Sequence, residues 1–437
     1  MNMFSSLGIL KNKNFSLLIT SESTSLFGTL FLNVALSLYV LKLTGSPEKF
    51  ASVLALGIVP HIILGSISGI LADKFDKKLW VITFDILRGL LCLGLFAFSF
   101  IGTINMPLIY FTVIFISSCD ILFAPMFISI LPTIVSEEKL VDANSVSRTL
   151  NETMKILSPL LGTLTYTLAG LGTVFLVNGL SFFVSAITIY LMKLPARGKP
   201  TGKKLTFFRD ISEGFRVIFA DKRLLSVVSN AFLTHTFLYP FLFVGIPYII
   251  VNVLVGKNTD YGIVESVATI GSIMAILVVP FTKKLGVSNN IGIGLLGMVV
   301  PVGFLFLLGN GNFIKFLTGH SFYIVSYFSI INLILFLAFS FYVVYFASYY
   351  QSKVPRESYG RFIASVIVMN GIGKVAGYKV VGMLFAMDSL IYPLIFLAIG
   401  ISLKLIVHIP FMIITRNIEK IAKVEVSTEK TTLKQSV

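Results

Sequence analysis

Long apolar segments alternate with short polar turns along the whole chain. A helix that crosses a bilayer needs about 20 consecutive apolar residues, whereas the strands of a membrane β-barrel alternate polar and apolar residues over about 10 positions. The apolar runs of this chain are continuous and of helical length. The pattern predicts an all-α fold of twelve transmembrane helices, at 15–41, 47–71, 79–101, 106–131, 146–169, 172–193, 224–254, 261–282, 289–309, 322–350, 361–385 and 389–414.

One polar segment, 194–223, is much longer than the other turns. It begins with a basic stretch that contains Gly and Pro, and it continues with Phe208, Ile211 and Phe215 at helical spacing opposite charged side chains. This spacing predicts an amphipathic helix on the membrane surface; a solvated loop is the alternative. We therefore expect an N-terminal six-helix bundle over 1–194, a cytoplasmic linker over 195–223, a C-terminal six-helix bundle over 224–415 and a cytoplasmic tail over 416–437.

Composition places the chain in a membrane rather than in water. Of its 437 residues, 56% are hydrophobic and 13% are charged, whereas a soluble domain carries about 25% charged residues. The net charge of +15 arises mainly from Lys and Arg in the expected loops, which indicates attraction to anionic lipid and not binding of nucleic acid. The loops on the same side as both termini are the basic ones, so the positive-inside rule predicts cytoplasmic termini in a plasma-membrane protein.

The sequence holds no motif of an enzyme or of a cofactor site. Cys92 and Cys119 lie inside apolar runs and form neither a disulfide framework nor a metal-binding pattern. There is no nucleotide-binding loop and no constellation of His residues. The first apolar run is too long for a cleavable signal peptide. We therefore expect a membrane protein without enzymatic activity, metal or cofactor.

The turn between the helices expected at 47–71 and 79–101 is the most distinctive motif. It reads Gly65-Ser-Ile-Ser-Gly69-Ile-Leu-Ala-Asp73-Lys74-Phe-Asp76-Lys77-Lys78, and it resembles the loop 2–3 signature of the major facilitator superfamily. Three further segments resemble its drug-exporting branch, which includes macrolide efflux proteins: Leu43-Thr-Gly-Ser46, Ser158-Pro159-Leu-Leu-Gly162 and Tyr359-Gly360-Arg361. The resemblance implies two six-helix bundles that bind a small molecule between them and open alternately to either side of the membrane.

The same turn is a candidate conformational latch. Gly65 and Gly69 form a ridge of small residues on one helix, and Gly373 and Gly377 form another on the helix at 361–385; small residues let membrane helices approach closely. The resemblance implies that the two helices pack across the bundles on the cytoplasmic side, with Asp73 at a positive helix N-terminus. The alternative is a helix-terminal carboxylate in a solvated loop. The basic members of the expected latch are Lys74, Lys77, Lys78 and Arg361.

Two carboxylates inside apolar runs are candidates for carrying a proton or binding a substrate charge, because an ionisable group within a membrane helix is costly. Glu22 lies among Ser and Thr residues in the first run, and Asp120 lies in the fourth. A structural carboxyl is the alternative for each. Transporters that this chain resembles often place an Arg near the position of Asp120 on the same helix, whereas this chain has Ile116 and Ser117 there.

Other charged residues inside the runs divide into candidate sites and structural pairs. Lys374, Lys379 and Glu265 are candidates for binding a proton or a substrate charge; for the two lysines, extension of the side chain toward the membrane surface is the alternative. Asp85 pairs with Arg88 at helical spacing, and Arg148, Glu152 and Lys155 can form a similar ladder; both groups are expected to be structural. Lys404 and His408 are expected at the membrane interface, and His235 is expected to be a satisfied polar residue rather than a metal ligand.

These observations together predict a secondary active transporter, with proton-coupled efflux of an amphipathic drug or antibiotic as the leading hypothesis. An importer of a nutrient, lipid or siderophore with the same fold is the alternative, and a non-transporting sensor or enzyme is a remote one. The expected partners are a small-molecule substrate, a coupling proton and the lipid bilayer, and a monomer is expected. The identity of the substrate, the direction of transport and the coupling ion are left open by the sequence.

Overall fold

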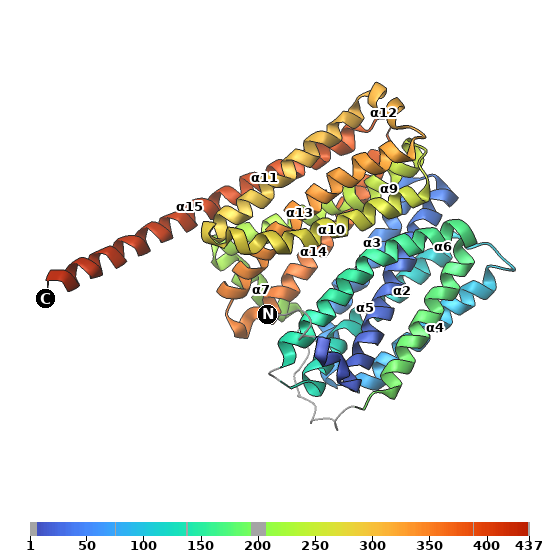
Figure 1. The fold of residues 1–437 in the computed structure, drawn as a ribbon, viewed down its shortest axis with the longest axis horizontal. Coiled ribbons are helices and arrows are strands. Elements are labelled where there is room, and N and C mark those ends of the chain that lie inside the picture. Colours follow the sequence, from blue (N-terminus) through green and yellow to red (C-terminus); the bar gives the residue numbers. More distant parts are fainter. Residues whose placement is uncertain (1–6, 75, 137–138, 194–206, 388, 436–437) are drawn as a thin grey trace.

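A computed structural model of the protein describes residues 7–74, 76–136, 139–193, 207–387 and 389–435, and these residues form helices and short turns without a strand (Figure 1). The first half contains η1 (Leu7–Lys11), α2 (Lys13–Thr44), α3 (Pro47–Lys74), α4 (Lys77–Phe98), α5 (Met106–Ile134) and α6 (Leu140–Leu191). The linker helix α7 spans Phe207–Ala220. The second half contains α8 (Lys222–Leu233), η3 (Thr234–Leu238), η4 (Phe241–Gly245), α9 (Ile246–Tyr248), η5 (Ile249–Val253), α10 (Asn258–Thr282), η6 (Lys283–Leu285), α11 (Val287–Leu305), η7 (Phe306–Gly309), α12 (Gly311–Leu317), α13 (Ser321–Lys353), α14 (Arg356–Phe385) and α15 (Ile391–Gln435).

The described helices agree with an all-α membrane fold and are consistent with twelve spans. Ten helical runs are long and apolar enough to cross a membrane. One of them, α6, contains two of the expected helices, because Gly170 bends it at a positive φ of 77°, a conformation that Gly adopts without steric cost. The remaining expected span is α14, which is long but carries Lys374 and Lys379 in its sequence. The C-terminal segment that was expected to be a tail continues as helix to Gln435.

The helices form two bundles that lie side by side (Figure 1). In the first, α6 packs against α2 and α4, and α3 packs against α5; in the second, α13 packs against α10 and α11, and α15 packs against α8 and α11. Large apolar side chains such as Ile101, Leu168 and Phe281 are exposed on the outside, as lipid-facing residues are. The end of the bundles where α2 begins is called the terminal end. Successive helices alternate in direction, so α7 also lies at this end. The other end is called the opposite end.

Contacts between the bundles are made by α3 with α14 and by α6 with α10. A Cβ atom on Gly382 would lie 2.9 Å from the Ala51 Cβ, which shows how closely α14 approaches the start of α3 at the opposite end. In the other pair, the Ser266 hydroxyl of α10 donates to the Ile156 carbonyl of α6 (2.9 Å). Both contacts rest on small residues, which allow membrane helices to approach closely.

The two glycines of α14 that the sequence predicted at the contact with α3 lie elsewhere. A Cβ on Gly65 would reach Ile367 of α14 at 3.9 Å, so this glycine does lie at the contact between α3 and α14. Gly373 and Gly377 instead pack against Thr236 and its neighbours in their own bundle. The glycine of α14 that meets α3 most closely near the middle of the helix is Gly371, whose Cβ would collide with Ile62. Helix periodicity explains the error, because residues two positions apart lie on different faces.

The linker helix α7 is docked on the first turns of α14. The Ser365 hydroxyl donates to the Ile211 carbonyl (2.9 Å), and Glu213 forms ion pairs with Arg209 (2.8 Å) and with Arg361. Hydrogen bonding by Arg209, together with the nearby Arg361, lowers the pKa of Glu213 from its ordinary value of 4.5. Arg209 belongs to α7 itself, so the part of this effect that favours docking is the pair of ionised Glu213 with Arg361. That part is present above the ordinary pKa of 4.5 and is lost as the pH falls through the lowered pKa.

Gly214 is expected to be essential for this docking, because a Cβ there would collide with the Arg361 carbonyl oxygen and the Ser365 hydroxyl. Gly214→Ala should lower stability by about 1–3 kcal/mol, the usual cost of overpacking, and should make the linker easier to cleave by protease. Thermal unfolding and limited proteolysis of the full chain measure these effects. Gly360→Ala is the matched control, because nothing lies within 4 Å of its Cβ position. Equal behaviour of the two variants would contradict this account of docking.

Candidate functional site

A cavity of about 680 Å³ lies between the two bundles. Its walls come from α2, α3, α5 and α6 in the first bundle and from α10, α13, α14 and the continuous run Lys222–Val253 in the second. The lining is mainly apolar with a small number of polar groups, as is typical of small-molecule sites. The cavity therefore lies where the resemblance to a transporter family predicted a substrate site.

The second bundle supplies an aromatic wall. Tyr239 stacks on Phe243 with ring centroids 5.5 Å apart, and Phe339 meets Tyr239 edge-on at 5.7 Å. Tyr239 lies between the π-helical segments η3 and η4, and Phe243 lies within η4. Such π-helical turns are frequent at functional sites. The result is an extended aromatic surface against which a flat or apolar molecule can pack.

The first bundle supplies an acidic network that opens into the cavity at Asp120. The side chain of Asp120 is 25% exposed, and it pairs with Arg88 of α4, whose side chain is fully buried. The same guanidinium also pairs with Asp85, which is equally buried. Arg88 further contacts the rings of Phe182 and Phe123, at 4.3 and 5.0 Å from the ring centroids. Two carboxylates thus share one cation in an apolar surrounding.

Hydrogen bonds extend this network away from the cavity. The Ser185 hydroxyl donates to Asp85 (2.5 Å) and lies 2.6 Å from the Ser21 hydroxyl of α2. With both carboxylates ionised and Arg88 charged, the network has one negative charge that no group within it balances. An uncompensated charge at a buried site is costly, so the arrangement favours uptake of one additional positive charge, either a proton or a cationic group.

The pairing of Arg88 with Asp120 was not predicted from the sequence. An arginine was sought near Asp120 on the same helix, but the structure supplies it from the neighbouring helix α4. A signal was available, because Arg88 is the single arginine among the first 147 residues. An arginine in the middle of an apolar run needs carboxylates around it, and Asp85 alone leaves part of the guanidinium without a partner.

Glu22 has a different environment from Asp120. Its carboxylate accepts hydrogen bonds from the Ser147 hydroxyl (2.9 Å) and the Asn151 amide (2.8 Å), so it links α2 to α6. It does not belong to the described residues that line the cavity. This geometry favours the structural alternative for Glu22.

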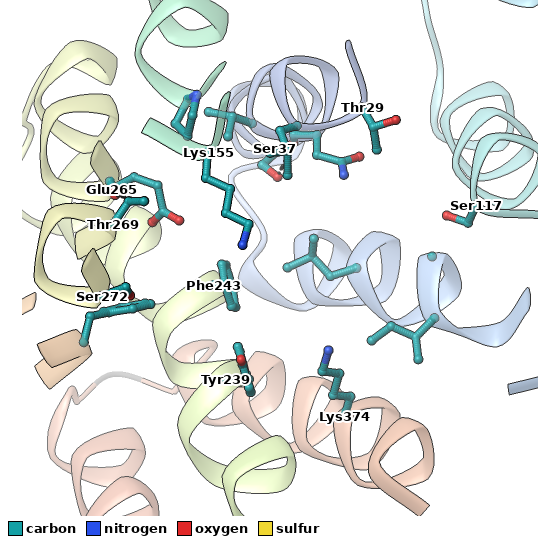
Figure 2. Close-up of a pocket in the computed structure, with 18 of the residues that line it drawn as sticks. Thr29, Ser37, Ser117, Lys155, Tyr239, Phe243, Glu265, Thr269, Ser272 and Lys374 are labelled. Atoms are coloured by element: carbon teal, nitrogen blue, oxygen red, sulfur yellow. Dashed lines mark hydrogen bonds between the residues drawn. The ribbon is translucent and has the colours of Figure 1, made fainter. Parts of the chain in front are cut away.

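Several charged side chains that the sequence singled out do line the cavity. Lys155 pairs with Glu152 at 2.8 Å, the ammonium of Lys374 lies 4.9 Å from the centroid of the Tyr239 ring, and Glu265 lies on the α10 wall. Figure 2 shows Lys155, Lys374 and Glu265 pointing into the same central space. Arg148, the other expected partner of Glu152, has its side chain outside the part of the structure that is described. His61 also lines the cavity and interacts electrostatically with both Asp120 and Lys374.

Two further lysines, Lys379 and Lys404, are not among the described lining residues. Lys379 is exposed, because a separation of five residues turns it away from Lys374. Lys404 was expected at the interface but is 1% exposed. Its ammonium donates to the Asn230 carbonyl (3.1 Å) and to the Thr234 hydroxyl, and it lies 4.6 Å from the centroid of the Tyr342 ring. These contacts exist because α15 packs directly against α8.

The histidines act as hydrogen-bonded polar residues. His235 is bonded to the Ala231 carbonyl (2.7 Å) and packs against Tyr239. His408, which was expected at the interface, is 3% exposed and bonded to the Ser288 carbonyl (3.1 Å). Within the described residues, no group of three or more His, Cys, Asp or Glu side chains is placed to hold a metal ion.

The expected latch is only partly described. The packing around Gly69 and the side chains of Asp73 and Lys74 lie outside the description. Lys78 donates to the Met192 carbonyl (2.7 Å), so it is bonded within its own bundle, and Lys77 is half-buried at the start of α4. Arg361 pairs with Glu213 of α7. The cross-bundle role of the latch therefore stays a prediction.

Comparisons with known proteins agree with the fold and the cavity. The family model of the Major Facilitator Superfamily matches residues 18–378. Macrolide efflux protein A of Streptococcus pyogenes is 26% identical over 211 residues, which are 47% of this chain and 51% of that protein. An uncharacterized MFS-type transporter of Bacillus subtilis is 26% identical over 234 residues, 52% of this chain and 54% of that protein. The chain thus matches about half the length of these curated relatives.

Solved structures resemble the whole fold at low sequence identity. A bacterial homologue of the iron transporter ferroportin, in its inward-facing state, has a TM-score of 0.67 and 15% identity, with 91% of this chain and 98% of that chain covered. A mutant of the nucleoside transporter NupG also has a TM-score of 0.67, with 14% identity and coverage of 91% and 99%. At these identities the similarity concerns the fold.

Proposed function

The chain belongs to the Major Facilitator Superfamily, and from this premise we propose that it is a proton-coupled exporter of an amphipathic drug or antibiotic. Membership makes it a multi-pass membrane transporter of small molecules and not an enzyme. The proposal adds the coupling ion, the direction and the class of cargo. We further propose that the chain consists of bundles over 1–194 and 224–415, a linker over 195–223 and a tail over 416–437. The protein acts as a monomer.

Proton coupling rests on a single arrangement, the sharing of Arg88 by Asp85 and Asp120. The network requires one additional positive charge, and Asp120 is its member that reaches the cavity. Protonation of this carboxylate and binding of a substrate cation in the same cavity oppose each other, because each adds one positive charge to the cavity. This opposition couples the movement of one to the movement of the other, because each is favoured when the other is absent.

Alternating access is supported by the way the bundles meet. Gly382 and Ala51 approach closely at the opposite end, and the cavity lies between the bundles further along. We assign the terminal end to the cytoplasm of a cell with this protein in its plasma membrane, on the basis of the basic loops. In this assignment the structure is closed toward the outside, and export requires α3 and α14 to separate at that end.

Locking this contact is expected to stop transport. In the double variant Ala51→Cys, Gly382→Cys, the two Cβ atoms start closer than the roughly 3.5–4.5 Å of a disulfide, so a small adjustment allows the bond. Cys92 and Cys119 are buried and stay in place. Oxidation should reduce transport to the level of protein-free vesicles, and a reductant should restore it. Each single-cysteine variant is the control. Full transport by the oxidised double variant would contradict alternating access through this contact.

Efflux is favoured over import by the aromatic cavity and by the relatives named macrolide efflux protein A. Import of a nutrient, lipid or siderophore is the second candidate, because the solved structures with this fold include a nucleoside transporter. Reconstituted vesicles with an imposed pH gradient, tested in both orientations of the gradient against a panel of drugs, separate the two. Gradient-dependent movement of a drug against its concentration supports export; gradient-dependent uptake of a nutrient with no drug movement supports import.

A further inference from the structure

The charges that line the cavity do not all have partners. Its described carboxylates are Asp120, Glu152 and Glu265, and its described ammonium groups are Lys155 and Lys374. Asp120 pairs with Arg88, and Lys155 pairs with Glu152. Within the described part of the chain, Glu265 and Lys374 are left without an ion pair or a hydrogen bond from their charged atoms.

These two side chains lie on different walls of one cavity and do not pair with each other. Glu265 comes from α10 and Lys374 from α14, and both point into the central space in Figure 2. The Lys374 ammonium lies over the Tyr239 ring, so its position is set by an aromatic contact and not by a carboxylate. The aromatic wall of Tyr239 and Phe243 lies next to Lys374 (Figure 2).

Binding of a ligand raises the free energy of each charge that is left without a partner. A cavity of about 680 Å³ has room for water that would solvate both groups in the absence of a ligand. A ligand that fills the cavity displaces this water, and a charge then left without a partner is heavily penalised. A cationic ligand would satisfy Glu265 and leave Lys374 unpaired, an anionic ligand would do the reverse, and a neutral ligand would leave both unpaired. A ligand with both charges would satisfy both.

We propose that the cavity selects an amphoteric aromatic substrate, with a basic amine that pairs with Glu265 and an acidic group that pairs with Lys374. The aromatic body of the substrate packs against Tyr239 and Phe243. This inference rests on the proposed function, since it takes the cavity to be the substrate site, and it narrows the cargo from amphipathic compounds in general to compounds that carry both charges. Asp120 is left free for the coupling proton.

The test is equilibrium binding to the full chain in lipid nanodiscs, with each ligand scaffold in three charge forms. Ciprofloxacin and biphenylalanine provide the form with both charges, their carboxylate esters carry the amine charge alone, and their N-acetyl derivatives carry the carboxylate charge alone. We expect the form with both charges of at least one scaffold to bind at least about 10-fold more tightly than either derivative, because a site with polar groups rejects analogues that lack their partner. Equal affinity of the three forms in both scaffolds, or binding of neither scaffold, would overturn the proposal.

Substitutions assign each charge to its residue. Lys374→Gln should remove the advantage over the ester, and Glu265→Gln should remove the advantage over the N-acetyl derivative. Lys374→Glu should invert the preference, so that the ester binds more tightly than the form with both charges. Lys379→Gln and Glu48→Gln are matched controls, because both side chains are exposed and neither is among the described lining residues. An unchanged preference in Lys374→Glu would also overturn the proposal.

Negative results in the binding assay and in the vesicle assay refute different proposals. Selective binding without gradient-driven movement would refute proton-coupled export and keep the assignment of the cavity. Gradient-driven export of singly charged drugs with no preference in binding would keep export and refute the amphoteric selection.

Discussion

Asp120→Asn is expected to abolish proton-driven accumulation of substrate, to the level of protein-free vesicles, while the protein stays folded. The amide has nearly the shape of the carboxyl and can still contact Arg88, but it does not take up a proton. It also removes the surplus negative charge of the network, since Arg88 then faces Asp85 alone. The measurement is substrate movement in reconstituted vesicles under an imposed pH gradient, with thermal unfolding as the check on folding.

The decisive comparison is between driven transport and exchange. If Asp120 carries the coupling proton, Asp120→Asn should still exchange labelled for unlabelled substrate across the membrane without a gradient, because exchange needs no net proton movement. Asp76→Asn is the matched control: Asp76 is exposed at the start of α4, where its side chain accepts from the Leu79 amide (2.9 Å), and Asn caps a helix equally well. Full gradient-driven transport by Asp120→Asn would exclude this residue as the proton site.

Arg88→Met is expected to have the largest effect on stability. Methionine fills much of the same space next to Phe182 and Phe123, but it leaves Asp85 and Asp120 without their common cation. Removal of one partner from a buried ionic network costs about 3–5 kcal/mol, which is a large part of the stability of a typical protein. The variant should therefore unfold at a markedly lower temperature in detergent and yield less folded protein.

The loss of stability in Arg88→Met should arise from the two carboxylates that lose their cation and not from lost packing. The triple variant Asp85→Asn, Arg88→Met, Asp120→Asn removes all three charges and should recover most of the stability, although it should not transport against a gradient. A double-mutant cycle between positions 85 and 88 measures their coupling. If the triple variant is as unstable as Arg88→Met, packing and not charge accounts for the loss.

Two lysines of the second bundle, Lys404 and Lys374, differ in how the surrounding groups stabilise their charge. Lys404 is buried without a carboxylate near it among the described residues, yet its ammonium donates to the Asn230 carbonyl and the Thr234 hydroxyl and faces the Tyr342 ring. Lys374 has the ring contact but no such hydrogen bonds, and it faces the cavity. The difference explains why Lys404 is assigned to the fold and Lys374 to substrate recognition.

Much of the fold was predictable because it depends on local properties. The bilayer requires about 20 apolar residues in each spanning helix, so the spans could be identified from run length alone. Two features make the spans harder to recognise in the structure: the helical run that bends at Gly170 between two expected helices, and α14, whose charged side chains reduce its apolar character. Neither conflicts with the twelve expected spans. The motif Gly65 to Lys78 correctly indicated the superfamily.

The candidate site was less predictable, because its chemistry depends on neighbours from other helices. The sequence singled out Asp120, Glu265 and Lys374 by their cost inside a membrane, and the structure places all three on one cavity. The sequence made Glu22 an equally strong candidate, although in the structure Glu22 is hydrogen-bonded to Ser147 and Asn151 within the first bundle. Nothing in the residues around Glu22 distinguishes these two environments.

The sequence by itself determined that this protein is a helical membrane transporter, because hydrophobic run length and a short charged motif are properties of contiguous residues. Only the tertiary structure decided which charges are paired, which glycines meet across the bundles and which side chains reach the cavity. The physical reason is that successive side chains of an α-helix point in different directions around its axis. A pairing such as Arg88 with Asp120 therefore depends on how two helices are rotated and packed against each other, which their sequences alone do not specify.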